Sequence, residues 1–139
     1  MASCGLDRET GQPLTDLDHV AQHVETLFAT RLGELIMARG YGAGLSELLG
    51  RRILPALVAR YKTLLALAID TWEPRLKVVR IEAAGNSANA VTLGQMQFQV
   101  LAYYRPRGHL GDFTVEGGLR GFRLVATGTR MRVAIDRVA

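Results

Sequence analysis

Cysteine is almost absent from the sequence, because Cys4 is the only one in 139 residues. A single cysteine excludes a disulfide within the chain and a metal site made only of thiolates. It also suits a protein of a reducing compartment. Aromatic residues make up only 6% of the chain, which is little for a cleft that binds saccharides.

Long apolar runs are also missing. No stretch approaches the roughly 18 consecutive apolar residues of a membrane-spanning helix. The first residues, MASCGLDRETGQPL, carry charged and polar groups where a signal peptide has its apolar segment. We therefore expect no contact with a membrane, and a protein that stays in the cytoplasm where it is made.

The charge balance is mildly basic, with 17 Lys and Arg against 13 Asp and Glu and a net charge of +4. Arginine pairs well with carboxylates as well as phosphates, so a protein partner fits as well as nucleic acid. The arginines of the C-terminal half have little aromatic interleaving and match no nucleic-acid motif, so we expect no nucleic-acid binding. They are Arg105, Arg107, Arg120, Arg123, Arg130 and Arg132.

Two amphipathic helices are predicted in the first half. Thr15 and Asp18 have the spacing of a capping box at the start of the first helix. Pro55 suits the first turn of the second helix, and Pro74 ends it. The apolar stripe of the first helix is Leu17, Val20, Val24, Leu27 and Phe28, and that of the second is Leu54, Leu57, Val58, Tyr61, Leu64, Leu65, Ala68 and Trp72.

The segment between these helices is rich in glycine. We expect short helical pieces at residues 32–39 and 46–49, separated by a tight turn at Gly-Tyr-Gly-Ala-Gly, residues 40–44. A phosphate-binding loop would follow a strand and continue with Lys-Ser or Lys-Thr, and this segment does neither. A structural turn is the better interpretation.

After Pro74 the apolar period changes from 3.6 to 2, which predicts strands. They are expected at residues 75–84, 93–104 and 130–139, with a turn at 85–91 and one or two short strands within 113–126, broken by Gly117 and Gly118. Helices followed by strands indicate an α+β fold, with the N-terminal helices packed on one face of a small, mainly antiparallel C-terminal sheet. We expect a single domain, 1–139, with an extended arm (1–14), a helical part (15–72) and a sheet part (75–139).

Catalytic and metal-binding patterns are weak. His19 and His23 have helical i, i+4 spacing but no evident third ligand, so two histidines on a polar helix face are the simpler interpretation. Cys4 has no evident base near it. Glu73 could be desolvated beside Trp72 and act as one acid of a glycosidase pair. Nothing in the sequence places a partner for it among Asp70, Glu82, Asp112 and Glu116. We expect no cofactor and no metal.

Three stretches carry a resemblance to a known family: DRETGQPLTDLDHVAQHVETLFAT, LGELIMARGYGAGLSELL and WEPRLKVVRIE. In this order and spacing, the last with its Glu-Pro-Arg signature, the chain resembles the GPW/gp25 family of baseplate wedge proteins of contractile-tailed phages, tailocins and type VI secretion baseplates. The resemblance covers residues 7–125. It departs from the family at Leu35, where relatives commonly have an arginine.

The resemblance implies a structural protein and not an enzyme. Family members are baseplate subunits of the virion tail, present in six copies per baseplate ring and assembled in the host cytoplasm. They bind the helical core bundle of other wedge subunits and offer the first ring on which the tail sheath protein polymerises. Some relatives were labelled lysozymes, so a peptidoglycan-cleaving hydrolase of the tail is the alternative.

Two candidate contact sites follow. Pro74 would fix a rigid corner that displays Glu73 and Arg75, with Trp72 beside them, to the wedge subunits, and replacing either charged residue would leave the isolated fold intact. An open sheet edge could accept a strand from the sheath, or could simply complete the protein's own sheet. The candidates for this edge are Phe122, Leu124, Arg130, Arg132 and Val133.

Overall fold

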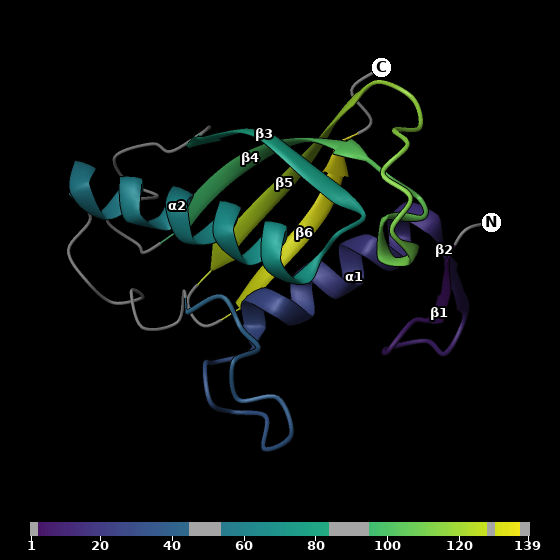
Figure 1. Ribbon diagram of the computed structural model, residues 1–139. Helices are drawn as coiled ribbons and strands as arrows, with labels where there is room; N and C mark the ends of the chain where they lie inside the picture. Colours follow the sequence, from purple (N-terminus) through teal and green to yellow (C-terminus); the bar gives the residue numbers. More distant parts are fainter. Residues whose placement is uncertain (1–2, 45–53, 84–94, 128–129, 137–139) are drawn as a thin grey trace.

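Two helices lie on one face of a four-stranded antiparallel sheet, and a short hairpin lies beside the first helix (Figure 1). The computed structural model describes residues 3–44, 54–83, 95–127 and 130–136. The helical piece predicted at 46–49 and the turn predicted at 85–91 lie outside these ranges. No helix in the described ranges is both long and apolar enough to cross a membrane.

Helix α1 (Asp16–Ala29) forms where the 3.6-residue period predicts it. Its buried residues are Val20, Ala21, Val24, Leu27 and Phe28. The expected capping box is wrong, because Thr15 occupies the N-cap position without a side-chain hydrogen bond. The backbone of the N-terminal arm takes part instead, since the Asp16 N–H donates to the Ser3 carbonyl at 3.0 Å.

Helix α2 (Pro55–Trp72) begins and ends at the residues that proline chemistry predicts. Pro55 takes the first turn, where its missing N–H breaks no helical bond. Pro74 follows the C-cap residue Glu73 and prevents a further turn. Leu57, Tyr61, Leu65, Ala68 and Ile69 are buried under the sheet, whereas Leu54, predicted in the same stripe, is 53% exposed just before the helix.

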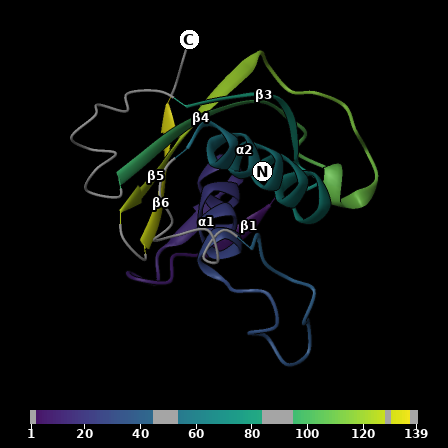
Figure 2. The ribbon, with the colours of Figure 1, turned by 90° about the vertical axis from the view of Figure 1, so that its left-hand side faces the viewer.

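The sheet has the strand order β3-β4-β5-β6, and every neighbouring pair is antiparallel. Its strands are β3 (Leu76–Ala83), β4 (Gln95–Tyr104), β5 (Leu119–Thr127) and β6 (Arg130–Asp136). Alternation along β4 places Met96, Phe98, Val100, Ala102 and Tyr104 on the buried face, as predicted. The α+β class is confirmed, and Figure 2 shows both helices under the same face of the curved sheet.

The core lies between this sheet face and the helices. Phe98, Leu27, Leu65 and Ile69 are among its largest fully buried side chains. Helix α1 packs against β6 and α2 against β3, so each helix covers a different part of one sheet face. The opposite face carries the polar residues of β4, and none of the helices in the described ranges covers it.

Three segments correct or extend the sequence-based expectations. Residues 32–39 form turns and no helix, because Gly33 has φ +82° and donates its N–H to the Arg39 carbonyl. Of the one or two strands expected within 113–126, the structure has one, β5, which begins directly after Gly118, and residues 113–118 are irregular. The N-terminal arm contains a hairpin of β1 (Cys4–Leu6) and β2 (Pro13–Thr15).

Candidate functional site

The Glu-Pro-Arg segment lies where α2 ends and β3 begins. Glu73 closes the helix, with its N–H donating to the Ile69 carbonyl at 2.8 Å. Pro74 and Arg75 lie in a turn, in which the Leu76 N–H donates to the Glu73 carbonyl at 3.1 Å. Glu73 and Arg75 point to one side of this turn, where their side chains bond at 2.7 Å, while Pro74 between them is exposed.

The shared side is the inside of the protein. Glu73 is 1% exposed and Arg75 8% exposed, so the expectation of a corner that displays both charges is wrong for the isolated chain. The physical reason is that α1 and the N-terminal arm, both distant in sequence, lie over this corner and supply polar partners. The sequence marked the corner itself but not which of its residues face water.

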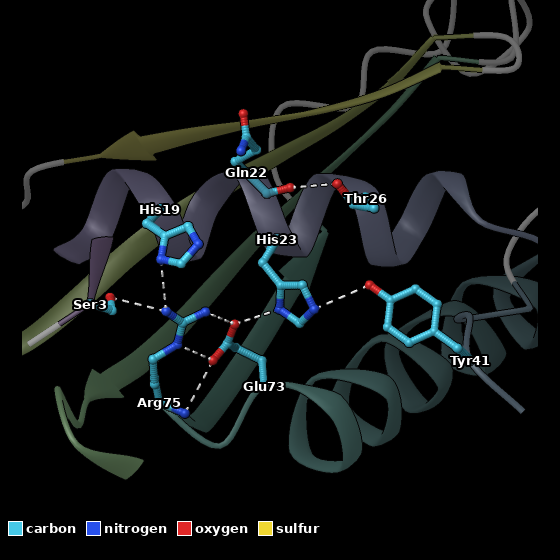
Figure 3. Close-up of polar contacts among 8 residues, drawn as sticks. All are labelled: Ser3, His19, Gln22, His23, Thr26, Tyr41, Glu73 and Arg75. Atoms are coloured by element: carbon cyan, nitrogen blue, oxygen red, sulfur yellow. Dashed lines mark hydrogen bonds and ion pairs between the residues drawn. The ribbon is translucent and has the colours of Figure 1, made fainter. Parts of the chain in front are cut away.

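Arg75 donates two parallel hydrogen bonds to the Glu73 carboxylate (Figure 3). Its Nε donates to Glu73 Oε1 and its Nη2 to Oε2, each at 2.7 Å. His23 Nδ1 lies 2.6 Å from Oε2. Because an ionised carboxylate only accepts, this ring nitrogen carries the proton and donates it. The carboxylate is thus held by an arginine fork and by an imidazole from α1.

Arg75 also reaches beyond its carboxylate partner. Its Nη1 donates to Ser3 Oγ at 3.0 Å and to His19 Nδ1 at 3.2 Å. The arm packs closely here, since a Cβ on Gly5 would lie 2.6 Å from the His19 ring. One guanidinium therefore joins the N-terminal arm and α1 to the start of β3.

His23 extends the network toward the segment after α1. Its Nε2 lies 3.1 Å from the Tyr41 hydroxyl. The Tyr41 ring meets Trp72 edge-on, with ring centroids 5.1 Å apart. Trp72 is half-buried against the core, so this predicted site residue works as a packing surface at the corner.

The histidines are the site residues that sequence reasoning missed. Their i, i+4 spacing correctly placed both on one helix face, and Glu73 and Arg75 face them there. No group of three or more His, Cys, Asp or Glu side chains suited to a metal ion occurs among the described residues.

The pKa values of the network follow from its geometry. Burial by itself raises the pKa of Glu73, but the hydrogen bonds from His23 and Arg75 and the charge of Arg75 outweigh it and lower the pKa to about 2. Burial, followed by the charge of Arg75, lowers the pKa of His19. Glu73 is therefore ionised at neutral pH, and His19 can accept from Arg75 as a neutral ring.

The other carboxylates considered for an acid pair have partners elsewhere or lie exposed. Asp70 lies 3.7 Å from Lys77 Nζ, Glu82 pairs with Arg80 at 2.6 Å, and Asp112 accepts from Thr114. Glu116 is exposed in the irregular segment before β5. The hydrogen bonds described for Glu73 come from Arg75 and His23, not from a second acid.

The residues expected at the sheath-binding edge lie on two different strands, one inside the sheet and one at its end. Phe122 and Leu124 are 3% and 1% exposed on β5, which lies between β4 and β6, so placing them on an edge is wrong. Arg130, Arg132 and Val133 lie on β6, the last strand of the sheet. Within the described ranges, β6 pairs with β5 on one side and with no strand on the other.

Comparison with known proteins identifies the family. The family described as Baseplate wedge protein gp25 matches residues 15–106, which include both helices and the Glu-Pro-Arg corner. The chain belongs to the gp25 family. It is also 29% identical to Baseplate protein W of Escherichia phage P2 over 89 residues, which are 64% of this chain and 77% of that protein.

Solved structures share the fold of this gp25-family chain. A baseplate chain of postcontracted pyocin R2 is similar with a TM-score of 0.60 and 22% identity, covering 73% of this chain and 98% of that one. A chain of the anti-feeding prophage baseplate is similar with a TM-score of 0.60 and 23% identity, covering 73% of this chain and 80% of that one. A Geobacter sulfurreducens crystal structure, provisionally described as a tail lysozyme, is similar with a TM-score of 0.59 and 18% identity. The match covers 91% of this chain and 97% of that one.

Proposed function

We propose that this gp25-family chain is a structural, non-catalytic baseplate wedge subunit of a contractile tail. In this proposal it binds other wedge subunits and primes sheath polymerisation, with six copies in each baseplate ring. Family membership over residues 15–106 supports the baseplate role, and the similarity to Baseplate protein W of phage P2 agrees with it.

The position of β6 is the observation that carries the sheath contact. An edge strand offers unpaired backbone N–H and C=O groups that a strand from another chain can extend. Arg132 is exposed on this strand and provides a positive charge beside the added strand. Arg130 and Val133 belong to the same edge strand.

The buried pair gives the wedge contact a rigid base. Glu73 and Arg75 are occupied inside the chain, so in this proposal they hold the α2–β3 corner while exposed Pro74 and half-buried Trp72 meet the wedge subunits. A fixed corner binds with less loss of conformational entropy than a mobile loop.

The chemistry of Glu73 argues against the hydrolase alternative. The general acid of a glycosidase must hold a proton near neutral pH, which requires a raised pKa. The pKa of Glu73 is lowered to about 2, and its carboxylate accepts from Arg75 and His23 instead of facing a substrate. An ionised, enclosed carboxylate is a structural anchor.

A photo-crosslinking amino acid at Arg132 tests the sheath contact in particles assembled from the protein's own tail genes. We expect capture of the sheath protein from Arg132 and no capture from the matched position Arg80, which is 69% exposed on the opposite edge strand β3. Capture of the sheath from Arg80 but not from Arg132 contradicts the proposed edge. Peptidoglycan cleavage by the purified chain, abolished in Glu73→Gln, would instead establish the hydrolase.

A further inference from the structure

The loop of residues 31–40, between α1 and Tyr41, exposes apolar side chains together. Leu35 is 44% exposed, Ile36 81% and Met37 98%. Single exposed apolar residues are common on proteins, but adjacent ones on a projecting loop mark an interaction site. Figures 1 and 2 both show this 31–40 loop extending away from the sheet and from α1.

The 31–40 loop is ordered by its own hydrogen bonds. The Gly33 N–H donates to the Arg39 carbonyl at 2.9 Å and closes the neck of the loop. The Arg31 N–H donates to Glu34 Oε2 at 2.8 Å. The neck is also tight, since a Cβ on Gly42 would lie 2.9 Å from the Thr30 carbonyl oxygen. The apolar tip is therefore held in shape before any partner arrives, which lowers the entropic cost of binding.

The buried network anchors the base of the loop. Ionised Glu73 accepts from His23 Nδ1, and Nε2 of the same ring lies 3.1 Å from the Tyr41 hydroxyl. Tyr41 follows the loop directly and also packs on Trp72. The Glu-Pro-Arg segment thereby positions the 31–40 loop through His23 and Tyr41.

The shape and charge of the loop define its partner. A convex apolar tip fits a concave apolar groove. Exposed Arg31 and Arg39 lie at the neck of the loop, on either side of the tip in sequence, while Glu34, the one acid between them, has an oxygen bound by the loop's own backbone. Two flanking guanidinium groups favour carboxylates at the rim of the groove.

We propose that the 31–40 loop is a docking element, inserting Leu35, Ile36 and Met37 into an apolar, carboxylate-rimmed groove of another baseplate subunit. The inference rests on the proposed baseplate role and adds a contact surface separate from β6. It assigns Glu73 a positioning role, through His23 and Tyr41, instead of direct contact with the partner.

The double variant Ile36→Glu, Met37→Glu tests the docking surface. The matched control is Leu67→Glu, Leu110→Glu, which adds the same charge at sites that are 62% and 71% exposed. Each tagged chain is co-expressed with the other baseplate proteins of its own system, and their co-purification is measured. We expect recovery to fall at least about tenfold for the loop variant, with unchanged thermal unfolding, and to stay at the wild-type level for the control.

The outcomes separate the inference from the proposed function. Wild-type recovery of baseplate proteins by the loop variant overturns the inference while the baseplate role stands. Failure of the wild-type chain to recover any baseplate protein overturns the baseplate role, and the inference with it. A wild-type dimer that the loop variant converts to monomer, measured by light scattering, shows a second copy as the occupant and overturns the inference. Unchanged recovery of baseplate proteins by the double variant Arg31→Glu, Arg39→Glu overturns the proposal that carboxylates line the rim of the partner's groove.

Tyr41→Phe tests the positioning role, because it removes the hydroxyl bonded to His23 and keeps the ring on Trp72. We expect the amides of Gly33, Ala38 and Tyr41 to exchange about fivefold faster, the factor that corresponds to one hydrogen bond of ordinary strength. Amides of β4 should be unchanged. Unchanged exchange in the loop overturns the positioning role.

Discussion

Arg75 reaches back across Pro74 and binds both carboxylate oxygens of Glu73, with Nε and Nη2 each at 2.7 Å. Both side chains of the pair are almost fully buried, although Pro74 between them is exposed. A buried ion pair gains little over an apolar replacement, but losing one partner is costly because the other charge remains in the interior. The pair therefore fixes the arrangement of arm, α1 and corner.

Glu73→Gln is expected to destabilise the fold by about 3 kcal/mol, because it leaves the Arg75 guanidinium buried without a counter-charge. The sequence alone suggested that replacing Glu73 or Arg75 spares the fold, and burial reverses that expectation. Urea unfolding measures the change. The control Glu82→Gln breaks the exposed pair with Arg80 and should change stability by less than about 0.5 kcal/mol. Equal effects of the two variants would contradict the role of burial.

Acid should weaken the fold through the same carboxylate. The folded-state pKa of Glu73, about 2, lies below its ordinary value of 4.5, so the unfolded chain binds a proton first as the pH falls. Its stabilisation is complete above pH 4.5 and is lost between pH 4.5 and about 2. The lowered pKa of His19 acts in the same direction, with a loss that begins below its ordinary value of 6.5.

The role of the Glu73 carboxylate in this acid sensitivity is tested by measuring the unfolding free energies of the wild type and of Glu73→Gln between pH 5 and pH 2. Because the variant has no carboxylate at this position, the difference between the two proteins should narrow from pH 5 toward pH 2. A difference that stays constant with pH would show that Glu73 does not titrate as described.

Gly108→Ala should disrupt the outer side of the corner. A Cβ at Gly108 would lie 2.2 Å from the Pro74 carbonyl oxygen, and backbone cannot yield as a side chain can. We expect a loss of about 2 kcal/mol or more in unfolding free energy. Gly118→Ala is the control, since nothing lies within 4 Å of its Cβ position, and its effect should be within about 0.5 kcal/mol. A neutral Gly108→Ala would show that the backbone approach is not needed.

The regular elements could be predicted from the sequence because their signals are local. Alternation from Met96 to Tyr104 predicted a strand with one buried face, and the structure buries those residues. Pro55 and Pro74 marked the two ends of α2 through constraints on their own backbone. The 31–40 loop was predicted incorrectly because Gly33 adopts a positive φ that residue composition does not reveal.

The environment of each face was decided only by the tertiary structure. Spacing put His19 and His23 on one helix face, but their contacts with Glu73 and Arg75 join residues 50 and 56 positions apart. Likewise the sequence-based prediction placed Phe122 and Leu124 on an open edge, whereas the order β3-β4-β5-β6 makes their strand β5 an interior one. Local sequence patterns determine whether a segment forms a helix or a strand. Which of its faces is exposed to water depends on the distant segments that pack against it.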